Sequence, residues 1–185
     1  MEFKRLLAEA GVEAVGAKEA GVEIVVEEDG ATFLANAQKK ARAYAEASAL
    51  PVLADDSGLV VEALGGAPGV LSARFGGPGL DDAGRVRYLL QQMEGVAERS
   101  ARYVCVLALA RPGRPARDVF VGQCDGRIAR EPRGEGGFGY DPVFLVPDGR
   151  TMAEVPPEEK DVLSHRGRAI REMREDFDLA GWAGR

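Results

Sequence analysis

Apolar and polar residues alternate along this chain with two periods, and each period predicts one type of secondary structure. Apolar residues spaced three and four apart predict amphipathic helices, and this spacing occurs over residues 1–11, 31–50, 80–95 and 156–177. Short runs rich in valine, leucine and isoleucine predict strands, and such runs occupy residues 22–30, 51–64, 101–110, 116–129 and 143–146. Helices that alternate with strands are typical of an α/β protein with a mixed β-sheet.

Turn-forming residues divide these elements. Thr32 precedes the second helix as its predicted N-cap, and Pro51 follows the end of that helix. Within residues 51–64, the pair Ser57-Gly58 predicts a kink between two extended segments. Loops or turns are predicted over residues 65–79, 111–115 and 130–142, and a break in the last helix is predicted near Ser164.

The composition limits the size and class of the protein. With 185 residues, of which 45% are hydrophobic, the chain is long enough for one domain, or two closely joined lobes, with a packed core. The net charge of -6 argues against binding nucleic acid through the overall field. No apolar run approaches the roughly 18 residues of a membrane helix, and nothing resembles a signal peptide. We therefore expect a cytoplasmic protein with no membrane partner.

The two cysteines, Cys105 and Cys124, form no CxxC pair, so the sequence indicates neither a zinc site nor a disulfide framework. They would lie about opposite each other if the turn over 111–115 closes a symmetric hairpin. In a cytosolic protein, however, two reduced core thiols are the expected state.

Four acidic residues accompany the predicted strands. Glu27 and Glu28 end one strand, and Asp55 and Asp56 stand in the segment LADDSGL. If these strands are neighbours, the carboxylates converge, and like charges at close range repel unless a cation lies between them. Oxygen-rich sites bind Mg²⁺ or Mn²⁺, and Mg²⁺ commonly combines one or two carboxylates with substrate phosphates. The alternative is that these acids are solvated strand ends and helix caps.

The glycine-rich segment GEGGFGYDPVF, residues 134–144, has features that suit a nucleotide. Its glycines allow the backbone to approach a ligand closely, and Phe138 or Tyr140 could stack on a base. The alternative is a connecting loop whose aromatic residues belong to the core.

Basic residues on two predicted helices could serve the same ligand. In EEKDVLSHRGRA, Lys160, His165 and Arg166 can donate hydrogen bonds to phosphate or carbonyl oxygens. The alternative is a capped amphipathic helix with an exposed basic start. In the helix over 31–50, Asn36 and Lys40 share one face; Lys40 could reach a phosphate, although spacing alone favours a surface lysine.

Five motifs occur in an order that resembles the Ham1/RdgB family. They are TFLANAQKKA, LADDSGL, LGGAPGVLSARFGG, GGFGYDPVF and LSHRGRA, and the similarity runs from about Glu2 to the C-terminal helix. The resemblance implies a Mg²⁺-dependent pyrophosphatase that hydrolyses the purine nucleoside triphosphates ITP, dITP and XTP to the monophosphate and pyrophosphate. It also implies an elongated α/β fold with two lobes, a central nucleotide-binding cleft and usually a homodimer, with residues 1–185 forming a single domain.

The resemblance assigns roles to individual residues. Glu27 and Asp56 match the family's metal ligands, with one Mg²⁺ per active site and Mn²⁺ as an alternative, and Asp56 also matches its proposed base. The substrate contacts that the match implies are Ser57, Phe138, Gly139, Tyr140, Asp141, Lys160, His165 and Arg166, the last two as the pair that reads the base.

The sequence departs from the family pattern in two places. Ala35 stands where the family commonly has glutamate. We expect this difference to have little effect on the site, because Glu27 and Asp56 remain. Met1-Glu2-Phe3 matches the helix that follows a strand of about 5–6 residues and a T-G-N-x-x-K phosphate loop. We therefore expect the sequence as given to be truncated at its start, and the chain as given to be unstable or nearly inactive.

Two other functions stay open from the sequence. One is a Maf-type pyrophosphatase for pyrimidine or modified nucleotides, against which the SHRG segment speaks. The other is a non-catalytic nucleotide-binding protein, against which the retained acids speak.

Overall fold

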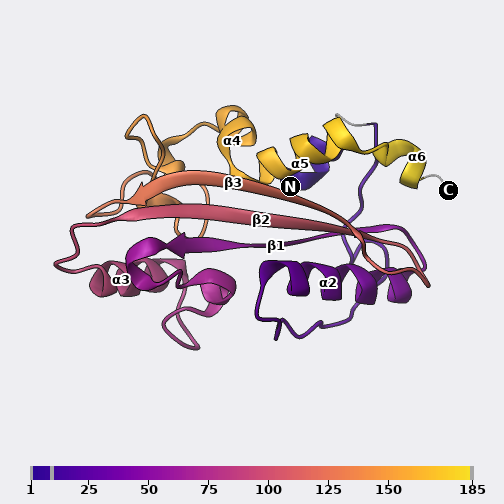
Figure 1. Cartoon of the computed structure of the whole chain (residues 1–185), viewed down its shortest axis with the longest axis horizontal. Helices are drawn as coiled ribbons and strands as arrows, with labels where there is room; N and C mark the ends of the chain where they lie inside the picture. The colour runs from indigo at the N-terminus through magenta and orange to yellow at the C-terminus, as the bar shows by residue number, and fades with distance from the viewer. Residues whose placement is uncertain (1, 9–10, 184–185) are drawn as a thin grey trace. The chain divides into compact units, whose positions relative to one another are not determined.

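The computed structural model describes residues 2–8 and 11–183, and Figure 1 shows its helices and strands. The helices are α1 (Glu2–Ala8), α2 (Phe33–Ser48), α3 (Asp82–Gln92), α4 (Pro157–Leu163), α5 (His165–Asp176) and α6 (Leu179–Ala183). The strands are β1 (Val52–Val61), β2 (Ser100–Ala110), β3 (Asp118–Ile128) and β4 (Phe144–Leu145). Short 3-10 helices cover Glu62–Leu64, Gly69–Arg74, Asp141–Val143 and Met152–Glu154.

The four strands form one sheet in the order β1-β2-β3-β4. Strands β3 and β4 pair antiparallel, with Arg127 opposite Leu145. Helices flank the sheet, so the predicted α/β fold is confirmed. The predicted break in the last helix is also confirmed, because Ser164 has extended backbone angles between α4 and α5.

The chain forms two compact units. Unit 1 consists of residues 1–56, 105–122 and 165–185, and unit 2 of residues 57–104 and 123–164. Each unit has its own apolar core. The core of unit 1 includes Leu6, Leu107, Leu109, Phe120, Ile170 and Met173. The core of unit 2 includes Leu59, Leu89, Met93, Phe144 and Met152.

In unit 1, the helix α2 begins where the sequence predicts. The Thr32 side chain accepts a hydrogen bond from the backbone N–H of Ala35, at 3.1 Å, and caps the helix. Three small residues on one face, Ala37, Ala41 and Ala45, are fully buried. Because alanine side chains are short, α2 lies close to its neighbours in the unit, and its longer polar side chains on the same turns reach β1.

In unit 2, the helix α3 is capped in the same way. The Asp81 carboxylate accepts a hydrogen bond from the N–H of Gly84 at 2.7 Å. Val86 and Leu89 bury the apolar face of α3 in the core of the unit. The beginning of α3 therefore has a fixed position relative to the rest of unit 2.

Two predicted features of the strands are wrong. Residues 22–30 form no strand: Val22 is buried, but Val25 is 98% exposed. A strand needs a hydrogen-bonded neighbour, and β-branched composition does not supply one. The predicted kink at Ser57-Gly58 is also absent, because β1 runs without interruption from Val52 to Val61. Asp55 and Asp56 consequently stand inside one strand and not at a break between two.

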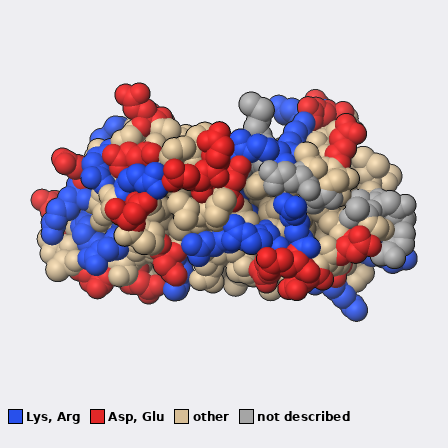
Figure 2. Space-filling view, turned by 90° about the horizontal axis from the view of Figure 1, so that it is seen from above, with Lys and Arg blue, Asp and Glu red and all other residues tan. Residues whose placement is uncertain are grey.

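Both cysteines are buried and are not joined in a disulfide, as predicted. Cys105 belongs to the core of unit 1 and Cys124 to the core of unit 2. On the surface, Figure 2 shows basic and acidic residues interspersed over the face in view.

Candidate active site

The two adjacent aspartates of β1 have separate environments, because successive side chains of a strand point to opposite faces. Asp56 is buried, with 6% of its surface exposed. Its Oδ1 accepts a hydrogen bond from Lys40 Nζ at 2.8 Å, and its Oδ2 accepts one from Asn36 Nδ2 at 3.3 Å. Asp55 Oδ2 accepts a hydrogen bond from Arg166 Nη2 at 3.2 Å. Each carboxylate therefore has its own cation, supplied by α2 or by α5, and their mutual repulsion is offset.

Lys40 joins Asp56 to a second acid. Its Nζ also donates a hydrogen bond to Glu28 Oε1 at 2.8 Å, and only 16% of the Lys40 side chain is exposed. The sequence interpretation of Lys40 as a surface lysine is therefore wrong. Asn36 is fixed from its other end, since its Oδ1 accepts a hydrogen bond from the Gly30 N–H at 2.8 Å. We call Glu28, Asn36, Lys40 and Asp56 the acid cluster.

Burial and charge act in opposite directions on the acid cluster. Burial raises the pKa of Asp56 above its ordinary value; the hydrogen bonds from Lys40 and Asn36 lower it, and the Glu28 charge adds to the rise. Burial by itself lowers the pKa of Lys40, but the bonds to Asp56 and Glu28 outweigh it, so that the pKa lies above its ordinary value. The ammonium thus stays charged and keeps both carboxylates in place.

In unit 2, a second network surrounds Asp141, which is only 2% exposed. The Asp141 carboxylate accepts hydrogen bonds from Tyr103 Oη at 3.2 Å, from the Phe138 N–H at 2.9 Å and from Lys160 Nζ at 2.5 Å. Lys160 Nζ also lies 5.0 Å from the centre of the Phe138 ring. An added Cβ at Gly137 would overlap the Asp141 carboxylate, so only glycine fits there. Asp141 therefore holds the loop and the lysine together.

The two aromatic residues of this loop differ in accessibility. Phe138 is 52% exposed, whereas Tyr140 is 4% exposed and its hydroxyl donates a hydrogen bond to the Ser72 carbonyl oxygen at 2.8 Å. Of the two aromatic rings predicted to stack on a base, only Phe138 is exposed enough for a ligand to contact it. Burial also raises the pKa of the Tyr140 phenol to about 12.

The remaining predicted residues lie on these same elements. Ser57 follows Asp56 in β1 and is half-buried. His165 is buried at the beginning of α5, and Arg166 follows it, with its guanidinium 5.4 Å from the centre of the Phe3 ring. Glu27 is exposed, and among the described residues Glu28, not Glu27, is the acid that shares a cation with Asp56.

The model of the Ham1 family matches residues 1–176 of this sequence. The chain belongs to the Ham1 family. Two similar proteins are named dITP/XTP pyrophosphatase. The one from Geobacillus kaustophilus is 49% identical over 100% of this chain and 92% of its own length. The one from Symbiobacterium thermophilum is 54% identical over 91% of this chain and 84% of its own length.

Solved structures of Ham1 proteins share the fold of this chain. The HAM1 protein from Coxiella burnetii has a TM-score of 0.85 and 43% sequence identity, over 94% of this chain and 90% of that one. The Ham1 protein from Staphylococcus aureus also has a TM-score of 0.85, with 39% identity over 98% of this chain and 92% of its own. The five ordered motifs therefore identify the family correctly.

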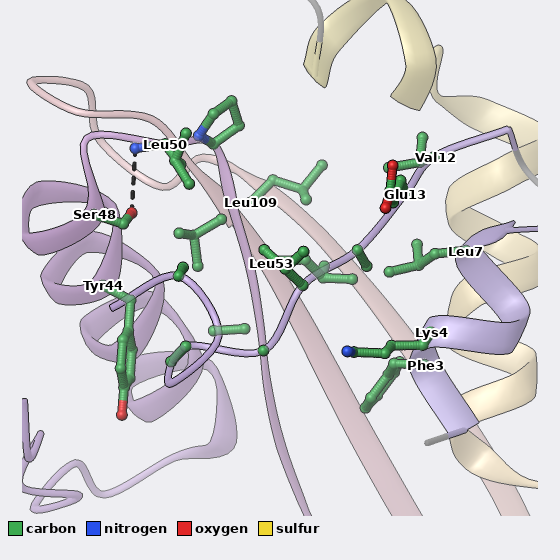
Figure 3. Close-up of a pocket in the computed structure, with 18 of the residues that line it drawn as sticks. Phe3, Lys4, Leu7, Val12, Glu13, Tyr44, Ser48, Leu50, Leu53 and Leu109 are labelled. Atoms are coloured by element: carbon green, nitrogen blue, oxygen red, sulfur yellow. Dashed lines mark hydrogen bonds between the residues drawn. The ribbon is translucent and has the colours of Figure 1, made fainter. Parts of the chain in front are cut away.

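A cavity of about 600 Å³ in unit 1 of this Ham1 protein is distinct from the predicted site residues. Figure 3 shows Phe3, Lys4 and Leu7 of α1 on one side of it and Tyr44 and Ser48 of α2 on the other. Its lining is mainly apolar, which does not suit a triphosphate, although Lys40 and Asp55 also contribute. The cavity is therefore not the candidate site; the acid cluster of unit 1 and the Asp141 network of unit 2 are described as two separate clusters.

The carboxylates of the acid cluster are the type of oxygen ligand that a divalent metal ion takes in proteins. Within residues 2–8 and 11–183, no three His, Cys, Asp or Glu side chains form a ready-made metal site. Mg²⁺ does not require one, because it commonly uses one or two carboxylates together with substrate phosphates. Glu28 and Asp56 each lie 2.8 Å from Lys40 Nζ, and these two carboxylates would be the residues to hold such a cation.

Sequence reasoning gave Asn36 and Tyr103 no specific role at the site, and it counted Glu28 only among the four acids that a cation could bring together. The spacing of Asn36 and Lys40 was the available signal, since residues four apart lie on one helix face. No comparable signal exists for Tyr103, whose contact with Asp141 joins residues 38 positions apart in the sequence.

Proposed function

We propose that this Ham1 protein hydrolyses non-standard purine nucleoside triphosphates, ITP, dITP and XTP, to the monophosphate and pyrophosphate. The observation that carries the proposal is the 49% identity, over the full chain, with a protein named dITP/XTP pyrophosphatase. The buried carboxylate and the lysine–carboxylate network support it, because they are the groups that phosphoryl chemistry requires.

The acid cluster is proposed to serve the phosphates. When bound, Mg²⁺ neutralises phosphate charge, and it is the proposed cofactor, held by Asp56 together with Glu27 or Glu28. Asp56 orients the water that attacks the α-phosphorus and accepts its proton, because a carboxylate whose pKa is raised by burial is a better base than an ordinary one. Lys40 and Asn36 hold the two Asp56 oxygens in fixed directions.

The remaining residues are proposed to contact the nucleotide. Phe138 stacks on the base, Lys160 contacts the substrate near it, and the 137–141 loop and Ser57 line the site. His165 and Arg166, or backbone N–H groups, donate to the oxygen at position 6 of hypoxanthine or xanthine. Adenine carries a donor amine there, so adenine nucleotides are rejected because the donors would stay unpaired.

The test is pyrophosphate release from ITP, dITP, XTP, ATP and GTP in Mg²⁺, with wild-type protein and Asp56→Asn. We expect release from the first three nucleotides only, abolished by EDTA and lowered about 100-fold or more in Asp56→Asn, since a missing general base costs that much. Asp29→Asn, which changes an exposed acid paired with Lys39, is the matched control and should keep wild-type rates.

The other outcomes separate the alternatives. Hydrolysis of pyrimidine nucleotides would favour the Maf-type activity, and binding of ITP without turnover would favour a non-catalytic role.

We further propose that the protein is a cytoplasmic homodimer. None of the described helices combines the length and the apolar composition needed to cross a bilayer. Sedimentation equilibrium should give about twice the chain mass of 19.7 kDa; a mass of one chain would contradict the dimer.

A further inference from the structure

The loop that carries Phe138 is held from two sides. On one side, the buried Asp141 carboxylate accepts the Phe138 N–H at 2.9 Å. On the other, the Asp82 carboxylate, at the first turn of α3, accepts the next N–H along the chain, that of Gly139, at 2.8 Å. Two consecutive N–H groups therefore donate to two different carboxylates, one local and one 57 positions away in the sequence.

This double attachment fixes the two peptide groups on either side of Phe138. The loop needs the fixation, because Gly137 and Gly139 both have positive φ, +77° and +59°, and glycine backbone is otherwise free to adopt many conformations. Phe138 is 52% exposed and lies under the Lys160 ammonium. An exposed aromatic ring on a glycine loop would move widely without such anchors.

The Asp82 side chain is accessible to solvent and does not cap helix α3. Its side chain is 60% exposed, and among the described residues it also forms an ion pair with Arg85 of the same helix at 3.7 Å. The cap of α3 comes from the neighbouring Asp81, which accepts the Gly84 N–H. The N-cap bond of α3 therefore does not involve Asp82.

We propose that Asp82 is a positioning residue that presets the 137–141 loop for nucleotide binding, and this inference rests on the proposed function. A loop that is ordered before binding loses less conformational entropy when the ligand arrives. Removing the acceptor should weaken substrate binding and leave the chemical step, at the acid cluster, unchanged.

The experiment compares Asp82→Ala, Asp82→Asn and Asp81→Asn with wild type, in steady-state hydrolysis of ITP and in amide hydrogen exchange at Gly139. Asp82→Ala should raise KM about three- to tenfold with kcat within about twofold, the size of one hydrogen bond, and should speed exchange at Gly139. Asp82→Asn keeps an acceptor oxygen, so its KM and its exchange rate at Gly139 should return to the wild-type values. Asp81→Asn removes the same charge one residue earlier, keeps a good N-cap, and should match wild type.

Three results would overturn the inference and leave the proposed function intact. The first is an unchanged KM in Asp82→Ala. The second is a lower kcat in Asp82→Ala that accompanies a lower Tm, since this would indicate a damaged fold. The third is an Asp82→Asn variant whose KM is as high as that of Asp82→Ala. A wild-type protein that hydrolyses no nucleotide would overturn the proposed function, and the inference with it. An active wild type whose Asp82→Ala variant keeps its KM overturns the inference alone.

Discussion

At the scale of single residues, the main feature of this protein is one lysine shared by two carboxylates. A half-buried lysine between Glu28 and Asp56 replaces the repulsion of two nearby negative charges by two attractions. Because both the ammonium and the Asp56 carboxylate are shielded from water, loss of either partner leaves a charge that solvent compensates poorly.

Replacing Lys40 by methionine should therefore destabilise the fold. We expect Lys40→Met to lower the free energy of unfolding by about 1–3 kcal/mol at neutral pH, because Asp56 and Glu28 lose their common partner. Lys39→Met is the control on the same helix: its partner Asp29 and its own side chain are exposed, and no measurable change is expected. Urea unfolding at pH 7 measures the free energy of unfolding of both variants. An equal decrease in Lys40→Met and Lys39→Met would contradict the shared role of Lys40.

The buried phenol of Tyr140 makes stability depend on alkaline pH. Burial raises its pKa to about 12 from 10.0, so the folded state keeps the proton to higher pH than the unfolded state does. The stabilisation is complete below pH 10 and is lost as the pH rises from 10 toward 12. Between pH 9 and pH 11, wild type should lose about 1 kcal/mol more than Tyr140→Phe, which has no phenol to titrate. If denaturant unfolding shows that wild type and Tyr140→Phe lose the same free energy of unfolding between pH 9 and pH 11, the prediction is wrong.

At the scale of elements, the position of α5 depends on close approach to β3 in unit 1. An added Cβ at Gly122 of β3 would overlap the His165 carbonyl oxygen and the Ala169 nitrogen, both backbone atoms of α5. The adjacent Val121 N–H donates a hydrogen bond to Glu172 of α5 at 2.9 Å. A strand residue without a side chain thus fixes the helix that carries His165 and Arg166.

Gly122→Ala should move α5 away from β3. We expect a loss of about 2–3 kcal/mol or more in the free energy of unfolding, because backbone atoms cannot yield as a side chain can. Gly113→Ala is the comparison. Nothing lies within 4 Å of its added Cβ, and only its φ of +69° is unfavourable, so about 1 kcal/mol is expected. Urea unfolding of the two variants gives the comparison, and an equal or smaller loss for Gly122→Ala would refute the close approach.

At the scale of the whole molecule, three strands tie the two units together through the chain itself. Each of β1, β2 and β3 contributes its residues partly to unit 1 and partly to unit 2. Unfolding of one unit would release one end of all three strands, and the hydrogen bonds at the other end would be weakened. We therefore expect the two units to unfold together.

Core substitutions in the two units should lower a single transition. Leu107→Ala in unit 1 and Leu89→Ala in unit 2 each remove a fully buried side chain and should each cost about 2–5 kcal/mol. Calorimetry should show one endotherm for wild type and for both variants, displaced to lower temperature in each variant. Two separate endotherms, of which each variant moves only one, would contradict the coupling.

Local chemistry explains which elements were predicted correctly. Helix α2 has a cap, Thr32, and a periodic alanine face, and both are encoded within about twenty neighbouring residues. The break at Ser164 is likewise local. Residues 22–30 were predicted wrongly because a strand exists only with a partner.

The sequence by itself determined the α/β class, the boundaries of most helices and the Ham1 family, since these depend on periodicity, caps and motif order. Only the tertiary structure decided that Lys40 lies between Glu28 and Asp56, that Tyr140 is buried while Phe138 is exposed, and that Asp82 holds Gly139. The Lys40 and Asp82 contacts join residues that are distant in the chain, whereas Phe138 and Tyr140 are neighbouring aromatic residues that differ in burial. No local pattern encodes them, because the energy of a charge or a ring depends on which atoms the fold brings against it.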